Sequence, residues 1–225
     1  KRICKQRNSR IFLYGKDFSA RTVHSCSLDG QVFDFTGIEK LKNVSIKMLG
    51  RYQVHNAAVA LESLFALKKK GFRIENNAIL RGMQNAFWPA RFHLIMRNPF
   101  VVLDGAHNPA GITSLKQTLK FYFPDKKFIF LIGILKDKKW QDMLKILLPV
   151  GKKFIFTKSN NPRSIAPEKL AEEMKRLSAH STIEVIEDPS FAVKRLVSMQ
   201  DTEPKIICGS LYLAGEILKI LRIKI

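Results

Sequence analysis

The feature that most constrains the fold of this chain is a repeated alternation of short apolar runs and amphipathic segments, which begins at residue 100. The apolar runs comprise residues 100–103, 128–132, 154–156, 206–208 and, more weakly, 183–186. The amphipathic segments comprise residues 112–122, 138–148, 167–178, 189–199 and 211–222. Runs that are solidly apolar are typical of strands buried on both faces of a parallel sheet. The pattern therefore predicts an α/β domain with a mostly parallel sheet.

The residues before this domain show a period typical of strands. Loose alternation at residues 10–14 and 31–35, with Asp29-Gly30 as a turn signal before the second run, predicts short antiparallel strands. Residues 44–49 are a further strand candidate. The front of the chain is therefore expected to contain a small antiparallel sheet.

Two helices are expected to follow these strands. From Val54 the apolar residues recur at helical spacing, and the pattern ends near Lys70-Gly71 with cations in the last turn. Residues 76–87 predict a second helix, which Trp88-Pro89 ends. We therefore divide the chain near residue 90, into residues 1–89 and residues 90–225.

The net charge of this chain is strongly positive. Its 225 residues include 39 Lys plus Arg and 19 Asp plus Glu, which gives a formal charge of +20. The 46% hydrophobic content excludes a disordered chain. Lysine clusters at residues 68–70 and 152–153 carry no interleaved aromatic residues, so we interpret them as a solvated surface. An anionic small-molecule ligand and a nucleic acid are the alternatives that the charge leaves open.

The cysteines and the apolar runs indicate the compartment. Cys4, Cys26 and Cys208 are scattered and form no CxxC pair, so neither a disulfide framework nor a clustered metal site is predicted. The longest apolar run, residues 128–135, is too short to span a membrane, and the basic start leads into no apolar signal segment. We expect a cytoplasmic protein with no membrane partner.

The sharpest local motif runs from Asp104 to Pro109, directly after the first buried strand. In open α/β sheets, ligands bind beyond the carboxyl ends of the strands. Asp104 could accept hydrogen bonds from ribose hydroxyls, and His107 could bind an anion or move a proton. The alternative is a capped helix start in which both residues are ordinary polar loop residues.

Three further residues are candidates for ligand contacts. Arg91, in Trp88-Pro-Ala-Arg-Phe92, could clamp phosphates or be an ordinary surface arginine. Asn56 could recognise an adenine edge or belong to a helix start. Ser210, after Gly209, could help bind a carboxylate or simply cap the last helix.

Together these motifs resemble the folylpolyglutamate synthase/dihydrofolate synthase family of the Mur ligase superfamily. The resemblance rests on GRYQVHNAAVALESL, FWPARF, VVLDGAHNP, GILKDKKW, NNPRS and IICGSLYLAGEI, in this order from about residue 50 to the end. It implies a Rossmann-like C-terminal Mur ligase domain at residues 90–225, preceded by the end of a central ATPase domain at residues 1–89.

The resemblance also implies the reaction. In this family ATP phosphorylates the carboxylate of folate or dihydropteroate, and the amine of L-glutamate attacks the acyl phosphate. Asn56 would then contact adenine, Arg91 the phosphates and Asp104 the ribose. His107 would be catalytic, near the phosphates or the incoming glutamate, and Ser210 would help hold that glutamate. The implied cofactors are ATP and Mg²⁺, and a monomer that binds no nucleic acid is expected.

The sequence departs from the family pattern at several positions. Ala90 stands where the family has Gly, His93 where it has an acidic residue, and Tyr52-Gln53 where it has His-Gln. No GxxxxGK[ST] phosphate loop is present. The resemblance implies that this loop, the Mg²⁺ ligands and a carbamylated lysine lie upstream of Lys1, so we expect no metal ligands in this chain and little ligase activity from it alone.

Three other functions remain open at this point. Another Mur-type ligase, which makes a peptidoglycan precursor, shares the fold, although cell-wall enzymes usually carry an aromatic residue where this chain has Gly105. A non-catalytic remnant of the family would keep only a binding surface. A basic nucleic-acid-binding module has only the bulk charge in its favour.

Overall fold

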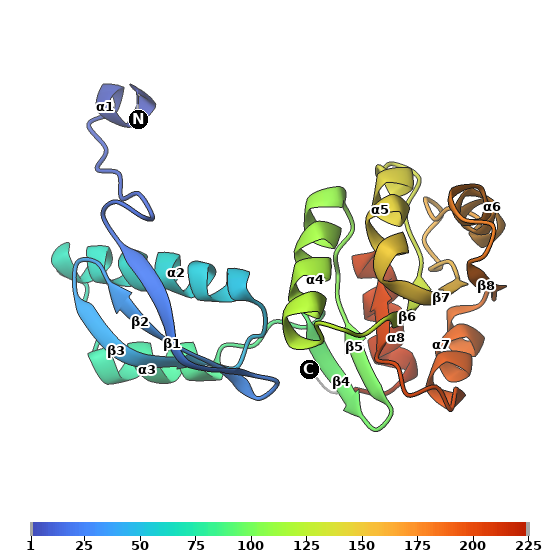
Figure 1. The fold of residues 1–225 in the computed structure, drawn as a ribbon. Helices are drawn as coiled ribbons and strands as arrows, with labels where there is room; N and C mark the ends of the chain where they lie inside the picture. Colours follow the sequence, from blue (N-terminus) through green and yellow to red (C-terminus); the bar gives the residue numbers. More distant parts are fainter. Residues whose placement is uncertain (1, 224–225) are drawn as a thin grey trace. The chain divides into compact units, whose positions relative to one another are not determined.

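The chain folds into two compact units, residues Lys1–Phe87 and Trp88–Ile225. The computed structural model describes residues 2–223, except for the side chains of residues 22–26 (Figure 1). The division falls close to the predicted one near residue 90. None of the helices in the described part of the chain is long and apolar enough to cross a membrane.

The first unit contains a three-stranded antiparallel sheet with two main helices. Its elements are α1 (Arg2–Gln6), β1 (Ser19–Ser27), β2 (Gly30–Thr36), β3 (Lys40–Ile46), α2 (Arg51–Lys69) and α3 (Asn76–Asn85). The strands pair in chain order, β1 with β2 and β2 with β3. Phe33 and Phe35 of β2 pack with Leu61 and Phe65 of α2 in one buried apolar cluster. This core closes one face of the small sheet with the apolar face of α2.

The prediction of a strand at residues 10–14 is wrong. Only Tyr14 forms an isolated bridge, to Phe18, and the first strand begins at Ser19. The Asp17 carboxylate accepts the N–H of Leu13 at 2.8 Å, and the Asp17 N–H donates to the Leu13 carbonyl at 2.8 Å. Because these local hydrogen bonds close a turn, Leu13 cannot join a ladder through the same groups.

The two predicted helices of this unit are present with shifted ends. α2 begins at Arg51, three residues before the first predicted apolar position, and ends at Lys69. α3 ends at Asn85, before Phe87, because Ala86 has an extended backbone (φ −57°, ψ 127°). The strand predicted at residues 44–49 is β3, which starts earlier and ends at Ile46.

The second unit is a six-stranded α/β domain, as the alternating pattern predicted. Its strands are β4 (His93–Arg97), β5 (Phe100–Leu103), β6 (Phe128–Ile132), β7 (Gly151–Phe156), β8 (Thr182–Val185) and β9 (Lys205–Cys208). Its helices are α4 (Pro109–Tyr122), α5 (Trp140–Leu147), η1 (Leu148–Val150), α6 (Pro167–Leu177), α7 (Pro189–Ser198) and α8 (Leu211–Ile220). The strand order is β4-β5-β9-β6-β7-β8, and every pair except β4–β5 is parallel.

Strand β4 is the element that sequence reasoning missed. It pairs antiparallel with β5 at the edge of the sheet, and its residues are only partly buried, apart from exposed Arg97. A short, half-buried edge strand gives neither a solid apolar run nor a clear alternation, so its sequence signal is weak.

Helices cover both faces of this sheet (Figure 1). Ala192 and Leu196 of α7 and Leu213 and Ile217 of α8 pack in one buried cluster with alternate strand residues such as Ile129. Neighbouring residues in a strand point to opposite faces, so the intervening residues, Phe128 and Phe130 among them, face α4 to α6. This two-sided burial explains why the strands are solidly apolar.

The position of β9 brings distant loops together. β9 lies between β5 and β6, so the segments after these three parallel strands meet at the same edge of the sheet. These segments begin at Asp104, Gly133 and Gly209. A crevice at the carboxyl ends of strands whose connections lead to opposite sides is the usual ligand site of open α/β sheets.

Candidate functional site

Asp104 is a buried carboxylate that braces the backbone at the end of β5. Only 5% of its surface is exposed. Its Oδ2 accepts the N–H of Phe92 and its Oδ1 accepts the N–H of Ala106, both at 2.8 Å. Burial raises the pKa of Asp104, while the two backbone N–H donors and the positive charges of Arg91 and His107 oppose that rise. Each oxygen retains a lone pair with which it can accept a further hydrogen bond. A contact to ribose stays a prediction.

Arg91 lies between two residues with left-handed backbone. Ala90 has φ 55° and Phe92 has φ 45°, and both are buried while Arg91 is exposed. The Ala90 carbonyl accepts the N–H of Gly105 at 2.7 Å, and Phe92 is held by Asp104. The chain on either side of Arg91 is thus bonded to the loop after β5, which keeps the guanidinium close enough to act on the pKa of Asp104.

His107 and Asn108 complete the loop in different ways. The His107 ring places Nδ1 2.8 Å from the Gly105 carbonyl. A proton on Nδ1 donates to that carbonyl and leaves Nε2 as an acceptor, which suits a proton-transfer role. Asn108 caps α4, because its Oδ1 accepts the N–H of Gly111 at 2.8 Å, and Pro109 takes the first helical position. The capped helix start that the sequence left open is therefore present, with His107 beside it.

Ser210 is the N-cap of α8 and lies against the same loop. Its buried Oγ accepts the N–H of Tyr212 at 3.1 Å. The preceding Gly209 donates its N–H to the Ala106 carbonyl at 2.9 Å. Gly209 has φ 111°, and a Cβ there would lie 2.6 Å from the Gly133 carbonyl oxygen, so only glycine fits. The cap is the local role of Ser210, and a contact to glutamate stays a prediction.

Asn56 belongs to the first unit and lies apart in the sequence from the other candidates. It is exposed within α2, and its Nδ2 donates to Gln53 Oε1 at 3.0 Å. The alternative that Asn56 starts or caps the helix is wrong, because Gly50 occupies the N-cap position. Its contact to adenine stays a prediction.

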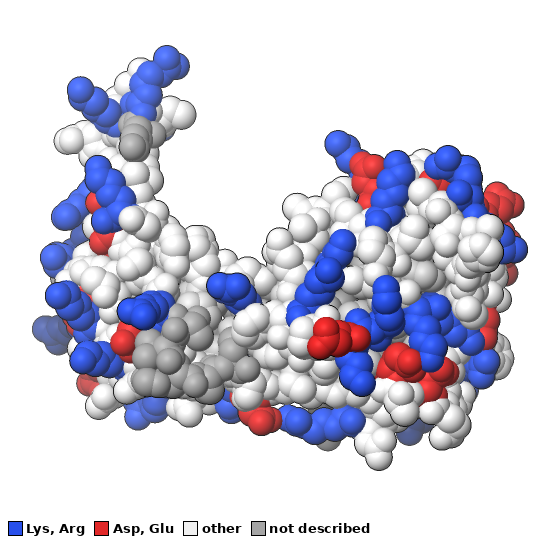
Figure 2. Space-filling model, viewed as in Figure 1, with Lys and Arg blue, Asp and Glu red and all other residues white. Residues whose placement is uncertain are grey.

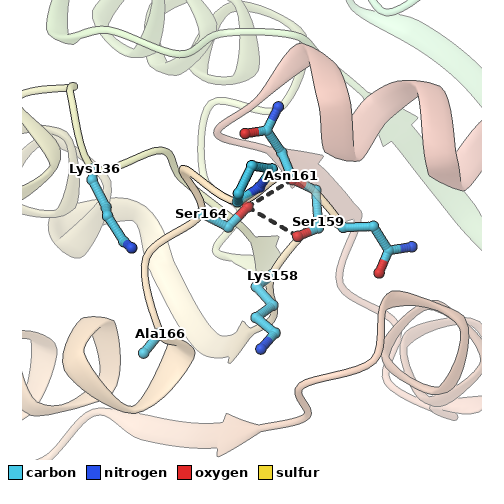
Figure 3. Close-up of a pocket in the computed structure, with 8 residues that line it drawn as sticks. Lys136, Lys158, Ser159, Asn161, Ser164 and Ala166 are labelled. Carbon is cyan, nitrogen blue, oxygen red and sulfur yellow. Dashed lines mark hydrogen bonds between the residues drawn. The ribbon is translucent and has the colours of Figure 1, made fainter.

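A second feature of this sheet edge is a pocket of about 470 Å³ between the loops after β6 and β7 (Figure 3). It is lined by Lys136, Lys158, Ser159, Asn160, Asn161, Pro162, Ser164 and Ala166. Figure 3 shows the Lys136 and Lys158 side chains reaching toward the same open space from the two loops. We call this feature the cationic pocket. Its two ammonium groups, with hydroxyl and amide groups nearby, suit a carboxylate ligand.

The wall of the cationic pocket is internally ordered. Ser159 and Ser164 are buried, and their Oγ atoms lie 2.8 Å apart. The Lys136 N–H donates to the Arg163 carbonyl at 2.8 Å, which joins the two loops. Lys158 forms an ion pair with Glu187, whereas no carboxylate among the described residues pairs with the Lys136 ammonium.

The motifs GILKDKKW and NNPRS belong to these loops, but sequence reasoning assigned a ligand to neither Lys136 nor Lys158. Lys138, two residues further along the same loop, pairs with Asp137 at 2.9 Å and does not line the pocket, whereas Lys136 does. The adjacency of β6 and β7 in the sheet is the signal that would have joined Lys136 to Lys158.

The charge elsewhere is dispersed. Figure 2 shows basic side chains spread over the visible face of each unit, with acidic side chains among them. Within residues 2–223, side chains 22–26 aside, no group of three His, Cys, Asp or Glu could hold a metal ion. The described residues therefore do not fit a Mg²⁺ site, and we assign no step to this metal.

An open parallel sheet with ligand loops at its carboxyl edge defines an α/β ligand-binding domain. Residues 90–211 match the family model described as "Mur ligase, glutamate ligase domain", and the chain belongs to this family.

Two relatives match most of the chain. A dihydrofolate synthase/folylpolyglutamate synthase of Bacillus subtilis is 32% identical over 196 residues, which cover 86% of this chain and 45% of the relative. The crystal structure of a folylpolyglutamate synthase from Thermotoga maritima has a TM-score of 0.83 and 31% identity. It covers 99% of this chain, and the chain covers 50% of it.

A Mycobacterium tuberculosis folylpolyglutamate synthase structure, complexed with ADP and AMPPCP, has a TM-score of 0.83 at 24% identity. It covers 96% of this chain, and the chain covers 50% of it. At this identity the likeness concerns the fold. The chain thus spans about half the length of the proteins that it matches.

Proposed function

We propose that this chain is the glutamate-binding part of an ATP-dependent ligase that adds L-glutamate to folate, to dihydropteroate or to both. The observation that carries the proposal is the pairing of two features at one sheet edge. The Asp104 loop follows β5 and is bonded to the segment that carries Arg91, and the cationic pocket lies between the loops after β6 and β7. The names of the Bacillus subtilis and Thermotoga maritima relatives support this class of reaction.

The chemistry of the two features suits the two anionic substrates. L-Glutamate carries two carboxylates, and the Lys136 and Lys158 ammonium groups offer charge-assisted hydrogen bonds to them. Arg91 is an exposed guanidinium next to the Asp104 loop and suits the phosphates of ATP. The ADP and AMPPCP complexes of the Mycobacterium tuberculosis protein with the same fold agree with a nucleotide ligand.

In this proposal each residue of the chain has a limited task. ATP supplies the phosphoryl group that activates the acceptor carboxylate. Arg91 binds phosphate oxygens, and Asp104 keeps the Arg91 backbone in place through its bond to Phe92. The cationic pocket orients glutamate, and His107 Nε2 accepts a proton from the glutamate amine when Nδ1 is bonded to Gly105. We place adenine near Asn56 and glutamate near Ser210 as further parts of the proposal.

The proposal is tested with Lys136→Ala and its matched control Lys138→Ala, in the natural protein that carries this chain. Loss of one charge-assisted hydrogen bond to a substrate should raise the KM for L-glutamate by roughly tenfold or more. The KM for ATP should stay unchanged, and the Lys138→Ala protein should behave as wild type, because Lys138 is paired outside the pocket. Radiolabelled glutamate incorporation measures both constants.

The acceptor is identified by three parallel assays, with tetrahydrofolate, dihydropteroate and a UDP-muramyl peptide. Incorporation into either of the first two supports the proposal and names the substrate. Incorporation into the UDP-muramyl peptide alone would overturn it in favour of a cell-wall ligase. Equal kinetics for Lys136→Ala and wild type would remove the cationic pocket from the mechanism.

A further inference from the structure

Helix α8 holds one wall of the cationic pocket at two points. We call residues 158–166, which form this wall, the pocket loop. Glu216 Oε1 accepts the N–H of Asn160 at 2.8 Å. The Tyr212 hydroxyl accepts a hydrogen bond from Arg163 Nη2 at 3.2 Å, and the Arg163 guanidinium lies 5.6 Å from the centre of the Tyr212 ring. Residues four positions apart share a helix face, so Tyr212 and Glu216 grip the loop from one side of α8.

The hydrogen bond from Asn160 to Glu216 is not duplicated by another contact between Asn160 and a different element of the described residues. Asn160 lines the cationic pocket, and its bond to Glu216 is the one hydrogen bond that ties it to another element within the described residues. The far end of the loop is secured differently, since the Ile165 N–H donates to the Ile134 carbonyl at 2.9 Å. Asn161 is held within the loop, since its Oδ1 accepts the N–H of Arg163 at 2.9 Å and its carbonyl accepts the N–H of Ser164 at 2.9 Å. The backbone at Asn160 therefore depends on α8 for its position.

The same helix is anchored at the other feature of the sheet edge. Ser210 begins α8, and the adjacent Gly209 donates its N–H to Ala106 in the Asp104 loop. One rigid helix thus contacts the Asp104 loop at its start and the pocket loop through Tyr212 and Glu216. A shift of α8 would move both.

We propose that Glu216 is a positioning residue, which holds the backbone at Asn160 so that the pocket loop keeps the shape in which it receives a bound glutamate. The inference rests on the proposed function, because it gives the cationic pocket that ligand. Glu216 uses one oxygen for the bond to Asn160, and its Oε2 is buried with no hydrogen-bond partner within the described residues. A single acceptor is enough for the task, so glutamine can replace glutamate at this position, but alanine cannot.

The test uses the 225-residue chain as wild type, Glu216→Gln, Glu216→Ala and the control Glu172→Ala, which changes an exposed glutamate of α6. Titration with L-glutamate, followed by NMR of the backbone amides, gives the dissociation constant. Hydrogen exchange gives the protection of the Asn160 amide. We expect Glu216→Ala to weaken glutamate binding by roughly tenfold and to lose protection at Asn160. The dissociation constant of Glu216→Gln should stay within about twofold of the wild-type value, and that of the Glu172→Ala control should equal the wild-type value.

The outcomes separate this inference from the proposed function. Wild-type affinity in the Glu216→Ala chain would overturn the inference alone, because glutamate would still bind. Equal losses of glutamate affinity in Glu216→Gln and Glu216→Ala would also overturn it, because a hydrogen-bond acceptor at position 216 would then not be what binding requires. No binding of L-glutamate to the wild-type chain at millimolar concentration would overturn both.

Discussion

The carboxylate of Asp104 accepts the backbone N–H of Phe92 at 2.8 Å, across twelve positions of sequence. The other oxygen of the same carboxylate accepts the N–H of Ala106 at 2.8 Å. One buried side chain therefore connects the segment that carries Arg91 to the loop that carries His107. The candidate phosphate-binding residue and the candidate proton acceptor are held in one arrangement by a single group.

The first prediction concerns this brace. Asp104→Asn replaces one carboxylate oxygen with an N–H₂ group, which opposes a backbone donor with another donor. We expect the free energy of unfolding to fall by about 1–3 kcal/mol, the cost of an unsatisfied buried hydrogen-bonding group. Urea unfolding measures it. Asp125→Asn, at an exposed position, is the control and should leave the midpoint unchanged. An unchanged midpoint for Asp104→Asn would show that the loop holds without the brace.

The second prediction concerns the left-handed backbone at Ala90. Ala90→Gly relieves a strain of about 1 kcal/mol, but it loses a buried methyl worth about 0.8 kcal/mol and gains chain entropy in the unfolded state. The terms oppose each other, so the change in unfolding free energy should lie within about 1 kcal/mol of zero. Ala90→Val adds a β-branched side chain at φ 55° in a packed site and should cost more than about 2 kcal/mol. Comparable stability of the two variants in thermal unfolding would contradict this account.

The third prediction concerns the close approach of Gly209 to Gly133. Gly209→Ala places a methyl 2.6 Å from a backbone oxygen, at a φ of 111°. We expect a loss of at least about 2 kcal/mol in unfolding free energy, because backbone on both sides must move. Gly215→Ala is the matched control within α8, since its added methyl meets nothing within 4 Å. It should stabilise the helix by about 0.5–1 kcal/mol. Chemical denaturation of both variants checks the contrast in sign.

The fourth prediction concerns pH. The Arg195 hydrogen bond, with Lys153 nearby, lowers the pKa of Glu184 below its usual value. A lowered folded-state pKa gives stability that is present above the ordinary carboxyl pKa and is lost as the pH falls through the folded-state value. Glu184→Gln should therefore reduce the unfolding free energy at neutral pH and flatten its decline in acid. Unfolding curves from pH 7 to about pH 3 measure the slope. Parallel pH profiles of variant and wild type would exclude this contribution.

The fifth prediction concerns Arg91 in the natural protein that carries this chain. Arg91→Ala should raise the KM for ATP and lower kcat/KM by tenfold or more, as expected for loss of a phosphate contact of roughly 1.5–3 kcal/mol. Arg91→Lys should recover only part of the activity, because an ammonium cannot bind bidentately. Arg97→Ala, at another exposed arginine of the same unit, is the control. An ATP-binding defect as large in Arg97→Ala would remove the special role of Arg91.

Much of the second unit follows from local sequence. The five parallel strands and the five helices between and after them are confirmed close to their predicted positions, because buried strands and amphipathic helices leave periodic patterns. Asp104, His107 and Ser210 lie at strand ends where the pattern placed them. The capped helix start in the Asp104–Pro109 motif and the cap at Ser210 were open alternatives in the sequence and are present, because capping depends on near neighbours.

The errors fall where one specific contact, near or distant, decides the outcome rather than a periodic pattern. Strand β4 exists because β5 offers an edge with which it can pair, and the turn at Leu13–Asp17 displaces a strand that the alternation favoured. Lys136 lines the cationic pocket because β6 and β7 are neighbours in the sheet, and Lys138 pairs with Asp137 instead. None of these partners can be inferred from periodicity.

The sequence by itself determined the α/β class of the second unit, the order of its strands and helices along the chain, and the motifs of the family. Only the tertiary structure decided that β9 lies between β5 and β6, that Asp104 braces Phe92, and that Glu216 holds Asn160. The physical reason is the separation along the chain between the residues that interact. Period, caps and turns are properties of neighbouring residues, whereas a buried carboxylate finds its hydrogen-bond donors only after the whole sheet has brought distant segments together.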